Sequence, residues 1–510
     1  IYTLSLHDAL PISYRIKNYE EIVDDPKNSI RFDQVQHHKT EQLEKTYGAD
    51  ARLILNNNGE VKLVNLTEKL LATLLAKLSN FIPDAGIWMN TLRPEWNDAN
   101  NALVGTGASM VTLCYMRRFV TFTRQLFSNA QTVSIAVSKE IFDFFENVFA
   151  ALIDNASNLE KGFTDQQRRT VTDELGRAGS NFRHSVYEGF SNQKAYISAS
   201  DIINFLNITL DYLDRSIENN KRADNMYHAY NIVSFGENVV TIRHLYEMLE
   251  GQVAVLSSGK LSASEANDVL NALSMSELYR ADQNSYILYP NKKLPSFLKK
   301  NEISSEEVMR ISLLKELISK GDSRIITQDK KGKFHFNAAF NNVGFLNQAL
   351  GNPDFKAEFK PTGDDITAIK NLYEKIFDHQ SFTGRSGTFY KYEGLGCIYW
   401  HMVSKLLLAI GENIERAIDD SACNEIVEAL KKHYSEVKAG IGAHKSPEEY
   451  GSFPFDPYSH TPLMAGVQQP GMTGQVKEDI ISRYFELGIH VEKGCIHFSP
   501  AMVNREEFSK

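Results

Sequence analysis

The chain has 510 residues, of which 42% are hydrophobic and 23% charged, with 30 Gly and 14 Pro. These proportions are typical of a folded globular protein and exclude a disordered or collagen-like chain. Because 64 Asp plus Glu outnumber 55 Lys plus Arg and give a formal charge of −9, there is no basic excess to neutralise a phosphate backbone, and we expect no nucleic-acid partner.

The cysteines show no spacing typical of a zinc site or a disulfide framework. We therefore expect no bound metal and a reducing compartment, the cytoplasm, with the periplasm as the alternative for a hydrolase with a missing upstream signal. The HExxH, Walker A and complete GxGxxG motifs are absent from the sequence, which excludes zinc-protease and nucleotide-binding functions. The most apolar stretches, Leu66–Leu78 and Cys397–Ile410, are short and contain Lys, Glu or His, so we expect no membrane span. The cysteines are Cys114, Cys397, Cys423 and Cys495.

The first residues do not resemble native protein sequence. Residues 1–13, IYTLSLHDALPIS, lack the basic start and the cleavage pattern of a secretory signal. The run LSLHDALPIS resembles translated adapter sequence at the ends of assembled metagenomic sequences, so it is left out of the fold prediction. We expect the native chain to begin further upstream.

The rest of the chain is predicted to be largely helical. Residues 14–65 form a partial upstream region with one hairpin, because Ala51–Leu55 and Val61–Val64 flank the turn Asn58-Gly59. From there to residue 488, apolar residues recur every three to four positions. The predicted helices are Val104–Phe127, Ile135–Ile153, 165–190, 198–219, 239–256, 303–319, 364–378, 395–418, 421–436 and 474–487, and further strands are predicted at Tyr286–Tyr289, Arg324–Thr327 and Val491–Phe498.

These elements predict a mainly α protein. No repeat of fixed length is present, which argues against a tetratricopeptide-type solenoid. Long helices joined by loops can bury their apolar faces in a closed double ring, an α/α barrel, or in a helical bundle array. Periodicity alone does not separate the two.

A polar and aromatic loop precedes the first of these helices. Residues 92–101 read LRPEWNDANN, and such a group of side chains is costly to bury unless each polar atom has a partner. An aromatic face beside carboxylates and amides suits a sugar, so we predict that Arg93, Trp96 and Asn97 bind substrate. The alternative is a helix cap formed by Asn and Asp, with Trp96 in the core.

Three further clusters have a similar composition. Residues 385–396, RSGTFYKYEGLG, precede an apolar helix, and their glycines suggest close approach to a ligand, with a capped helix start as the alternative. Residues 444–475 form a long aromatic stretch of the kind that is usually functional. Residues 222–231 are expected to line the opening of the same pocket, although a lone histidine such as His228 is more often structural. The substrate-binding candidates in these clusters are Tyr227, His228, Tyr390, Tyr392 and Gln469.

Several segments resemble one enzyme family. WNDANNALVGTGAS resembles the WNDG…G.GES segment of the cellobiose phosphorylase group of inverting glycoside phosphorylases and hydrolases. GMTGQVKEDIISRYFELGIHVEKGCIHFSP resembles its WLTGTA helix and the strand after it, and RSGTFYKYEGLG lies where the group has its NGG-aromatic-His loop. The resemblance covers residues 85–500. It implies an (α/α)6-barrel catalytic domain over residues 66–488, incomplete at its N-terminus, with residues 489–510 starting a C-terminal β element.

The resemblance also implies site residues. Asp98 matches the general acid, which protonates the glycosidic oxygen while phosphate or water attacks the opposite face. The group's loop histidine is replaced by Lys391 or Tyr392, and the Gln expected after a Pro-Tyr pair is replaced by His460 or Thr461. The phosphate-binding residues implied by the resemblance are Arg385, Lys391, His460, Thr473 and Gly474.

Two further functions remain open at this stage. If water is the nucleophile, a second carboxylate is needed as base, for which Glu393 is the candidate and Asp456 and Glu449 are runners-up. The protein is thus predicted to be an inverting phosphorylase of β-glucan-type oligosaccharides, an inverting glycoside hydrolase, or a non-catalytic glycan-binding protein. No cofactor is expected, and inorganic phosphate is the expected co-substrate of a phosphorylase.

Overall fold

The structure is a computed structural model in which the chain forms two compact units. The first unit comprises Ile1–Leu92, Val104–Pro290 and Gly396–Lys510, and the second comprises Arg93–Leu103 and Asn291–Leu395. The residues that the structure describes are 13–55, 60–91, 103–130, 133–291, 295–340, 343–378, 396–454, 457–463, 465–471 and 476–502.

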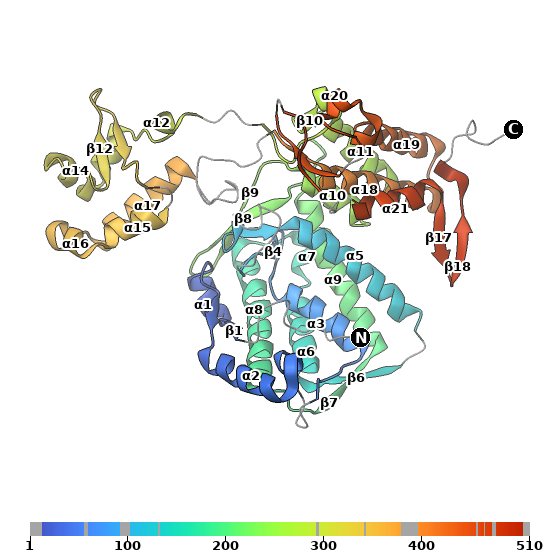
Figure 1. The fold of residues 1–510 in the computed structure, drawn as a ribbon. Helices are drawn as coiled ribbons and strands as arrows, with labels where there is room; N and C mark the ends of the chain where they lie inside the picture. The colour runs from blue at the N-terminus through green and yellow to red at the C-terminus, as the bar shows by residue number, and fades with distance from the viewer. Residues whose placement is uncertain are drawn as a thin grey trace. The chain divides into compact units, whose positions relative to one another are not determined.

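The prediction of a mainly α protein is confirmed in both units (Figure 1). Capping boxes start several helices, as where Ser262 and Glu265 bond each other's backbone N–H groups. The helices of the first unit are α1 (Tyr19–Asp24), α2 (Gln34–Tyr47), α3 (Leu66–Leu78), α5 (Met110–Ser128), α6 (Lys139–Asp154), α7 (Asn158–Lys161), α8 (Asp165–Glu188), α9 (Ala199–Asn219), α10 (Leu249–Ser257), α11 (Ala263–Ser274), α18 (Trp400–Asp419), α19 (Asn424–Ala439), α20 (Pro447–Tyr450) and α21 (Val476–Glu486), with 3-10 turns at Gly48–Arg52, Ala281–Gln283, Gly442–His444 and Pro500–Met502.

One local prediction in this unit was wrong in part, and another is supported as far as the described residues reach. The helix predicted over 239–256 is strand β9 (Val240–His244) followed by α10, because Val240 is buried and Thr241 and Arg243 are exposed, a period of two. The hairpin predicted around Asn58-Gly59 is represented by one bridge between Leu55 and Val61, and its turn lies outside the described residues.

Short strands that the sequence did not reveal form an antiparallel five-stranded sheet in the order β3-β4-β5-β8-β9. Its strands β4 and β5 pair through Ile87 and Ser109, and β5 pairs with β8 through Ser109 and Tyr230. The strands of the first unit are β1 (Tyr14–Ile16), β2 (Ile30–Phe32), β3 (Phe81–Ile82), β4 (Gly86–Trp88), β5 (Gly107–Ser109), β6 (Ser134–Ser138), β7 (Lys194–Ser198), β8 (Tyr230–Phe235), β9, β10 (Tyr279–Arg280), β11 (Ser285–Tyr286), β14 (Ile398–Tyr399), β15 (Tyr458–Thr461), β16 (Gln468–Pro470), β17 (Ile489–Glu492) and β18 (Cys495–Phe498).

Helix α10 packs between α5 and α18 and runs in the same direction as both. At its start, Glu250 accepts a hydrogen bond from the hydroxyl of Tyr230 (2.7 Å), which pairs with Ser109 directly before α5. At its end, the Ser258 carbonyl accepts from Arg117 of α5 (3.0 Å), and the Leu256 carbonyl accepts from Asn413 of α18 (3.0 Å).

The start of α10 is also linked to the start of α18. The amide of Leu249 donates to the Leu288 carbonyl (2.8 Å), and the amide of Leu288 donates to the carbonyl of Cys397 (3.3 Å), three residues before α18. The three helices therefore begin at one end of a layer.

Helix α21 packs on α18 in the same direction again. A Cβ atom at Gly411 would lie 2.9 Å from the Phe485 ring, and further along both segments Nδ1 of His490 lies 3.2 Å from Oε1 of Glu415. Position 411 thus meets position 485 and position 415 meets position 490, so both segments run in the same direction. The four helices α5, α10, α18 and α21 share one N-terminal end.

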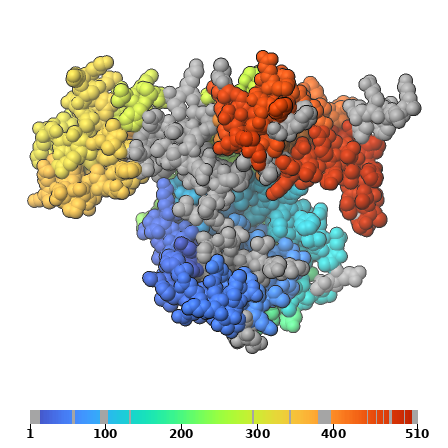
Figure 2. Space-filling model, in the orientation of Figure 1, coloured from blue at the N-terminus to red at the C-terminus, as the bar shows by residue number. Residues whose placement is uncertain are grey.

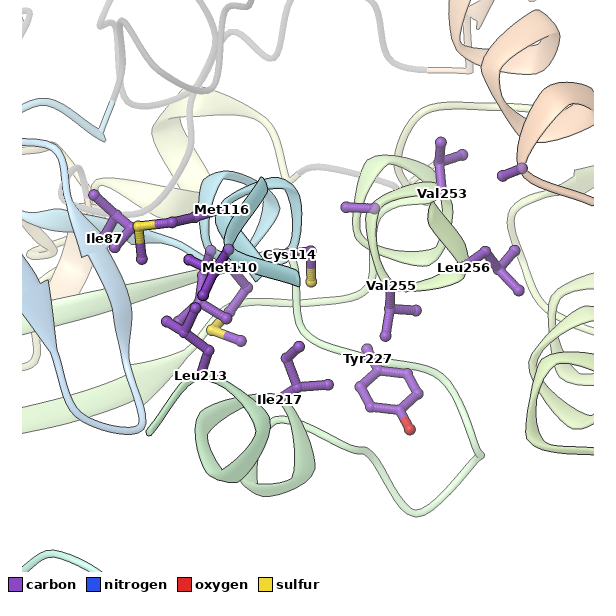
Figure 3. Packing of buried hydrophobic residues seen from close by; sticks show 14 of the residues in the cluster. Ile87, Met110, Cys114, Met116, Leu213, Ile217, Tyr227, Val253, Val255 and Leu256 are labelled. Carbon is purple, nitrogen blue, oxygen red and sulfur yellow. The ribbon is translucent and has the colours of Figure 1, made fainter. Parts of the chain in front are cut away.

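The core of this unit is formed by apolar side chains from these helices and from the sheet. Figure 3 shows Cys114 of α5, Ile217 of α9 and Val255 of α10 converging within it. On the surface, the C-terminal hairpin β17–β18, red in Figure 2, exposes Val491 and Phe498. In the described part of the chain, no helix is long and apolar enough to cross a lipid bilayer.

The second unit has a core of its own, in which Phe336, Tyr373 and Phe377 are in edge and tilted contact. The rings of Phe297 and Phe377 stack with centroids 6.3 Å apart, so the first and last described helices of the unit meet. The helix predicted at 303–319 is present as two helices. The elements are α12 (Phe297–Lys300), α13 (Ser305–Arg310), α14 (Ser312–Ser319), β12 (Ile326–Gln328), β13 (Phe334–Phe336), α15 (Val343–Gly351), α16 (Pro353–Phe359) and α17 (Gly363–Phe377).

Candidate functional site

Most of the predicted site residues lie outside the described residues, so the site is built from the segments that flank them. Of the predicted binding residues, the structure describes Tyr227, His228, His460 and Gln469, and it also describes the runner-up base Glu449. The predicted residues outside it are Arg93, Trp96, Asn97, Asp98, Arg385, Tyr390, Lys391, Tyr392, Glu393, Asp456, Thr473 and Gly474.

The segment that carries Asp98 leaves the first unit after β4 and returns at β5. Backbone hydrogen bonds close its base, from Gly105 N–H to the Met89 carbonyl (2.7 Å) and from Met89 N–H to the Gly107 carbonyl (2.9 Å). The indole N–H of Trp88 donates to the Gly105 carbonyl (3.0 Å). Because β5 runs directly into α5, both ends of this segment are fixed at the N-terminal end of that helix.

The segment with the predicted phosphate loop returns to the first unit at Gly396 and leads through β14 into α18. Strand β14 pairs with β15, where Tyr399 lies opposite His460, and their rings stack with centroids 5.8 Å apart. Strand β16 then pairs with β15 and carries Gln469, an exposed residue with φ +57°. The small sheet therefore brings His460 and Gln469 to the start of α18.

His401, in the first turn of α18, is a candidate that the sequence analysis missed. Its ring centroid lies 6.3 Å from that of Tyr399. Burial, and to a lesser degree the charge of Lys405, lowers the pKa of His401 to about 4, and burial also lowers the pKa of His460. Both imidazoles are therefore neutral near pH 7. The available signal was the position of His401 five residues after the glycine-rich loop 385–396.

His228 stacks on His244, with ring centroids 4.2 Å apart and ring planes 5° from parallel. The Nδ1 atom of His228 lies 2.9 Å from the Leu245 carbonyl, and that of His244 lies 2.7 Å from Oδ1 of Asn231. The amide nitrogen of Asn231 is used in bonds to Asn220 and to the Ala85 carbonyl, so its oxygen accepts and His244 donates.

The protonation state of this pair follows from its surroundings. Burial, together with the adjacent His244, lowers the pKa of His228 to about 4, and burial lowers the pKa of His244. Each neutral ring carries its proton on Nδ1, which leaves Nε2 as an acceptor for a hydroxyl group. The sequence identified His228 but not His244, because only the β8–β9 pairing brings the rings together.

Tyr227 and Glu449 have structural roles that are plain in the structure. Tyr227 is 5% exposed and packs in the core near Ile217 and Val255 (Figure 3). Its backbone N–H and carbonyl both bond the amide of Gln252 (2.9 and 2.8 Å). The carboxylate of Glu449 accepts from the backbone N–H and hydroxyl of Ser446 in a capping box. Substrate binding by Tyr227 and a role of Glu449 as base remain predictions.

The flanking segments converge because of the helix directions. The segment with Asp98 precedes α5, the phosphate loop precedes α18, and Thr473 and Gly474 precede α21, and these helices share one N-terminal end. Helix N-termini carry positive partial charge and unpaired N–H donors, so this end favours an anion. The arrangement can place an acid, an anion and hydroxyl-binding groups around one substrate.

Residues 294–380 match the family model described as GH149 phosphorylase insertion domain 2. The matched stretch lies within residues Asn291–Leu395 of the second compact unit, whose first and last described helices meet, as expected for an insertion. No curated protein matches the chain at a significant level.

Proposed function

We propose, from the premise that this chain is a glycoside phosphorylase, that it cleaves β-glucan-type oligosaccharides with inversion at the anomeric carbon. The observation that carries this proposal is the shared N-terminal end of α5, α10, α18 and α21, towards which the flanks of the predicted acid and phosphate segments lead. The match to a phosphorylase insertion domain supports phosphate, rather than water, as the nucleophile.

The proposed architecture of the catalytic domain is the (α/α)6 barrel. Parallel helices that line a ring, each followed by an antiparallel partner, would produce the layer formed by α5, α10 and α18. Helix α9 is antiparallel to α5. Arg117 of α5 pairs with Asp214 of α9, and two turns further along α5, Arg124 donates to Asn207 (3.3 Å), which lies two turns before Asp214 in α9. An antiparallel pair of this kind occurs in barrels and bundles alike, so it is the parallel layer that supports the barrel.

Asp98 is the proposed general acid. Its proton moves to the glycosidic oxygen as the bond from that oxygen to the anomeric carbon breaks, while a phosphate oxygen forms a bond to the same carbon from the opposite face. The products are a shortened oligosaccharide with a new hydroxyl and an α-sugar 1-phosphate. One catalytic carboxylate is sufficient, because phosphate is already an anionic nucleophile.

Phosphate is proposed to lie at the start of α18, between the flanks of two predicted loops. His401 and His460 are neutral near pH 7, so each would donate one hydrogen bond to phosphate without adding charge. Arg385 and Lys391 would supply the positive charge, and the Thr473-Gly474 backbone would supply N–H donors. His228 and His244 are proposed to accept hydroxyl groups of the sugar through Nε2.

The experiment is to incubate the protein with a panel of β-glucan oligosaccharides with and without inorganic phosphate. Release of α-sugar 1-phosphate, identified by NMR and strictly dependent on phosphate, is the expected result. Reducing sugar released without phosphate would replace the proposal with hydrolysis and Glu393 as base. No release from any member of the panel would favour glycan binding without catalysis.

A further inference from the structure

Arg280 lies on the β10–β11 hairpin and is 7% exposed. Its Nε and Nη2 atoms hold both carboxylate oxygens of Asp282, at 2.9 to 3.2 Å. Its Nη1 atom faces three backbone carbonyls, those of Gly396 (3.1 Å), Thr461 (3.2 Å) and Pro462 (3.1 Å). One guanidinium group thus joins three separate parts of the chain.

The bonded carbonyls belong to the two segments that bear the proposed phosphate contacts. Gly396 is where the chain re-enters the first unit after the loop with Arg385 and Lys391, and it has φ +70°. Thr461 directly follows His460 on β15. The distance between these segments is therefore held by Nη1 of Arg280.

The surrounding contacts make this connection stiff. The indole N–H of Trp400, the first residue of α18, donates to the Thr461 hydroxyl (2.9 Å). On the same hairpin, Gln283 donates to the Glu449 carbonyl (3.2 Å) and accepts from Lys445 (3.1 Å). The hairpin is thus bonded to Gly396 before β14, to Thr461 of β15, and to Lys445 and Glu449 at α20.

We propose that Arg280 is a positioning residue for inorganic phosphate, acting through the Gly396 and Thr461 carbonyls; this inference rests on the proposed phosphorolysis. Arg suits the task because its planar fork binds a carboxylate with one edge while the other edge serves carbonyl oxygens. Asp282 fixes the orientation of the fork. A lysine supplies the charge and donors to the carbonyls but cannot hold Asp282 at the same time.

The test compares Arg280→Gln and Arg280→Lys with the wild type in steady-state phosphorolysis, varying phosphate and oligosaccharide separately. We expect KM for phosphate to rise about 10- to 100-fold in Arg280→Gln, because displacing a binding group by about 1 Å has effects of that size. Arg280→Lys should recover only part of the loss, because lysine keeps the donors to the carbonyls but loses the contact with Asp282, and KM for the oligosaccharide should stay unchanged. A merely structural role would lower kcat through loss of folded protein and leave both KM values alone.

Arg324→Gln is the matched control, because Arg324 also binds an aspartate two residues away, Asp322, but lies in the second unit. Its KM for phosphate should equal that of the wild type. If a thermal melt shows that Arg280→Gln does not fold, the test rests on Arg280→Lys. A KM for phosphate of that variant within about 1.5-fold of the wild type would overturn the inference. Absence of phosphate-dependent turnover in the wild type would overturn both the proposed function and this inference. An active wild type whose KM for phosphate is the same in the Arg280 variants would overturn only the role of Arg280.

Discussion

Substituting Gly105 by alanine tests how the base of the acid segment is built. Gly105 has φ +87°, and a Cβ atom there would lie 2.9 Å from Cγ of Lys27 and 3.1 Å from the Pro26 carbonyl group. The left-handed backbone costs an alanine about 1–2 kcal/mol. Crowding against a backbone that does not yield adds about 1–3 kcal/mol, so the free energy of unfolding should fall by about 2–5 kcal/mol in total.

Gly162→Ala is the control for the backbone contribution alone. Gly162 has φ +84° in the same unit, and its only neighbour near a new Cβ is Nη2 of Arg215 at 3.5 Å, an ordinary contact. Urea unfolding at 25 °C should show a loss of about 1–3 kcal/mol for this control, since its φ of +84° and ψ of +165° suit glycine. Phosphorolysis should fall in Gly105→Ala and not in Gly162→Ala, since the Gly105 N–H closes the segment with Asp98. Equal losses of stability and equal activities in the two variants would refute this reasoning.

Three other predictions concern acid stability, the general acid and the second unit. The pKa values of His228 and His401 are lowered to about 4 in the folded protein from about 6.5 when unfolded. Their contribution to the free energy of unfolding should therefore be fully present above pH 6.5 and be lost as the pH drops from 6.5 to 4. His401→Gln should make the slope of stability against pH shallower, and an unchanged slope in chemical unfolding would contradict the assignment. Asp98→Asn should reduce turnover by about 10²–10⁴-fold at unchanged melting temperature, while Asp354→Asn in the second unit should keep full turnover. Phe377→Ala should destabilise the second unit by about 3–5 kcal/mol, seen in calorimetry as a shift of one transition only, and a shift of all transitions would show that the two units unfold together.

Some of the fold follows from local sequence. Apolar residues spaced by three and four, together with a cap such as Ser262 with Glu265, fix a helix within its own segment, and most predicted helices are present. The segment 239–256 shows the limit of this argument. A strand of five residues and a helix of nine follow each other there, and the apolar residues of both merge into one apparent helical period.

The sequence also marked the polar loops by their composition, which requires no knowledge of neighbours. The sequence could not show which of these loops lie close together in the fold. The two- and three-residue strands of the five-stranded sheet carry too few residues for a pattern, and Gly107–Ser109 becomes a strand because of its pairing with Tyr230. Tertiary structure alone set the helix directions that bring the loop ends together.

The same division holds for individual side chains. Local sequence determined the helices, the mainly α class and the loops rich in aromatic and polar groups, because these depend on residues a few positions apart. Tertiary structure decided that His244 stacks on His228, that His401 becomes a neutral group at the start of α18, and that Arg280 joins Gly396 to Thr461. Stacking, burial and hydrogen bonding between distant residues depend on packing, which no local pattern encodes.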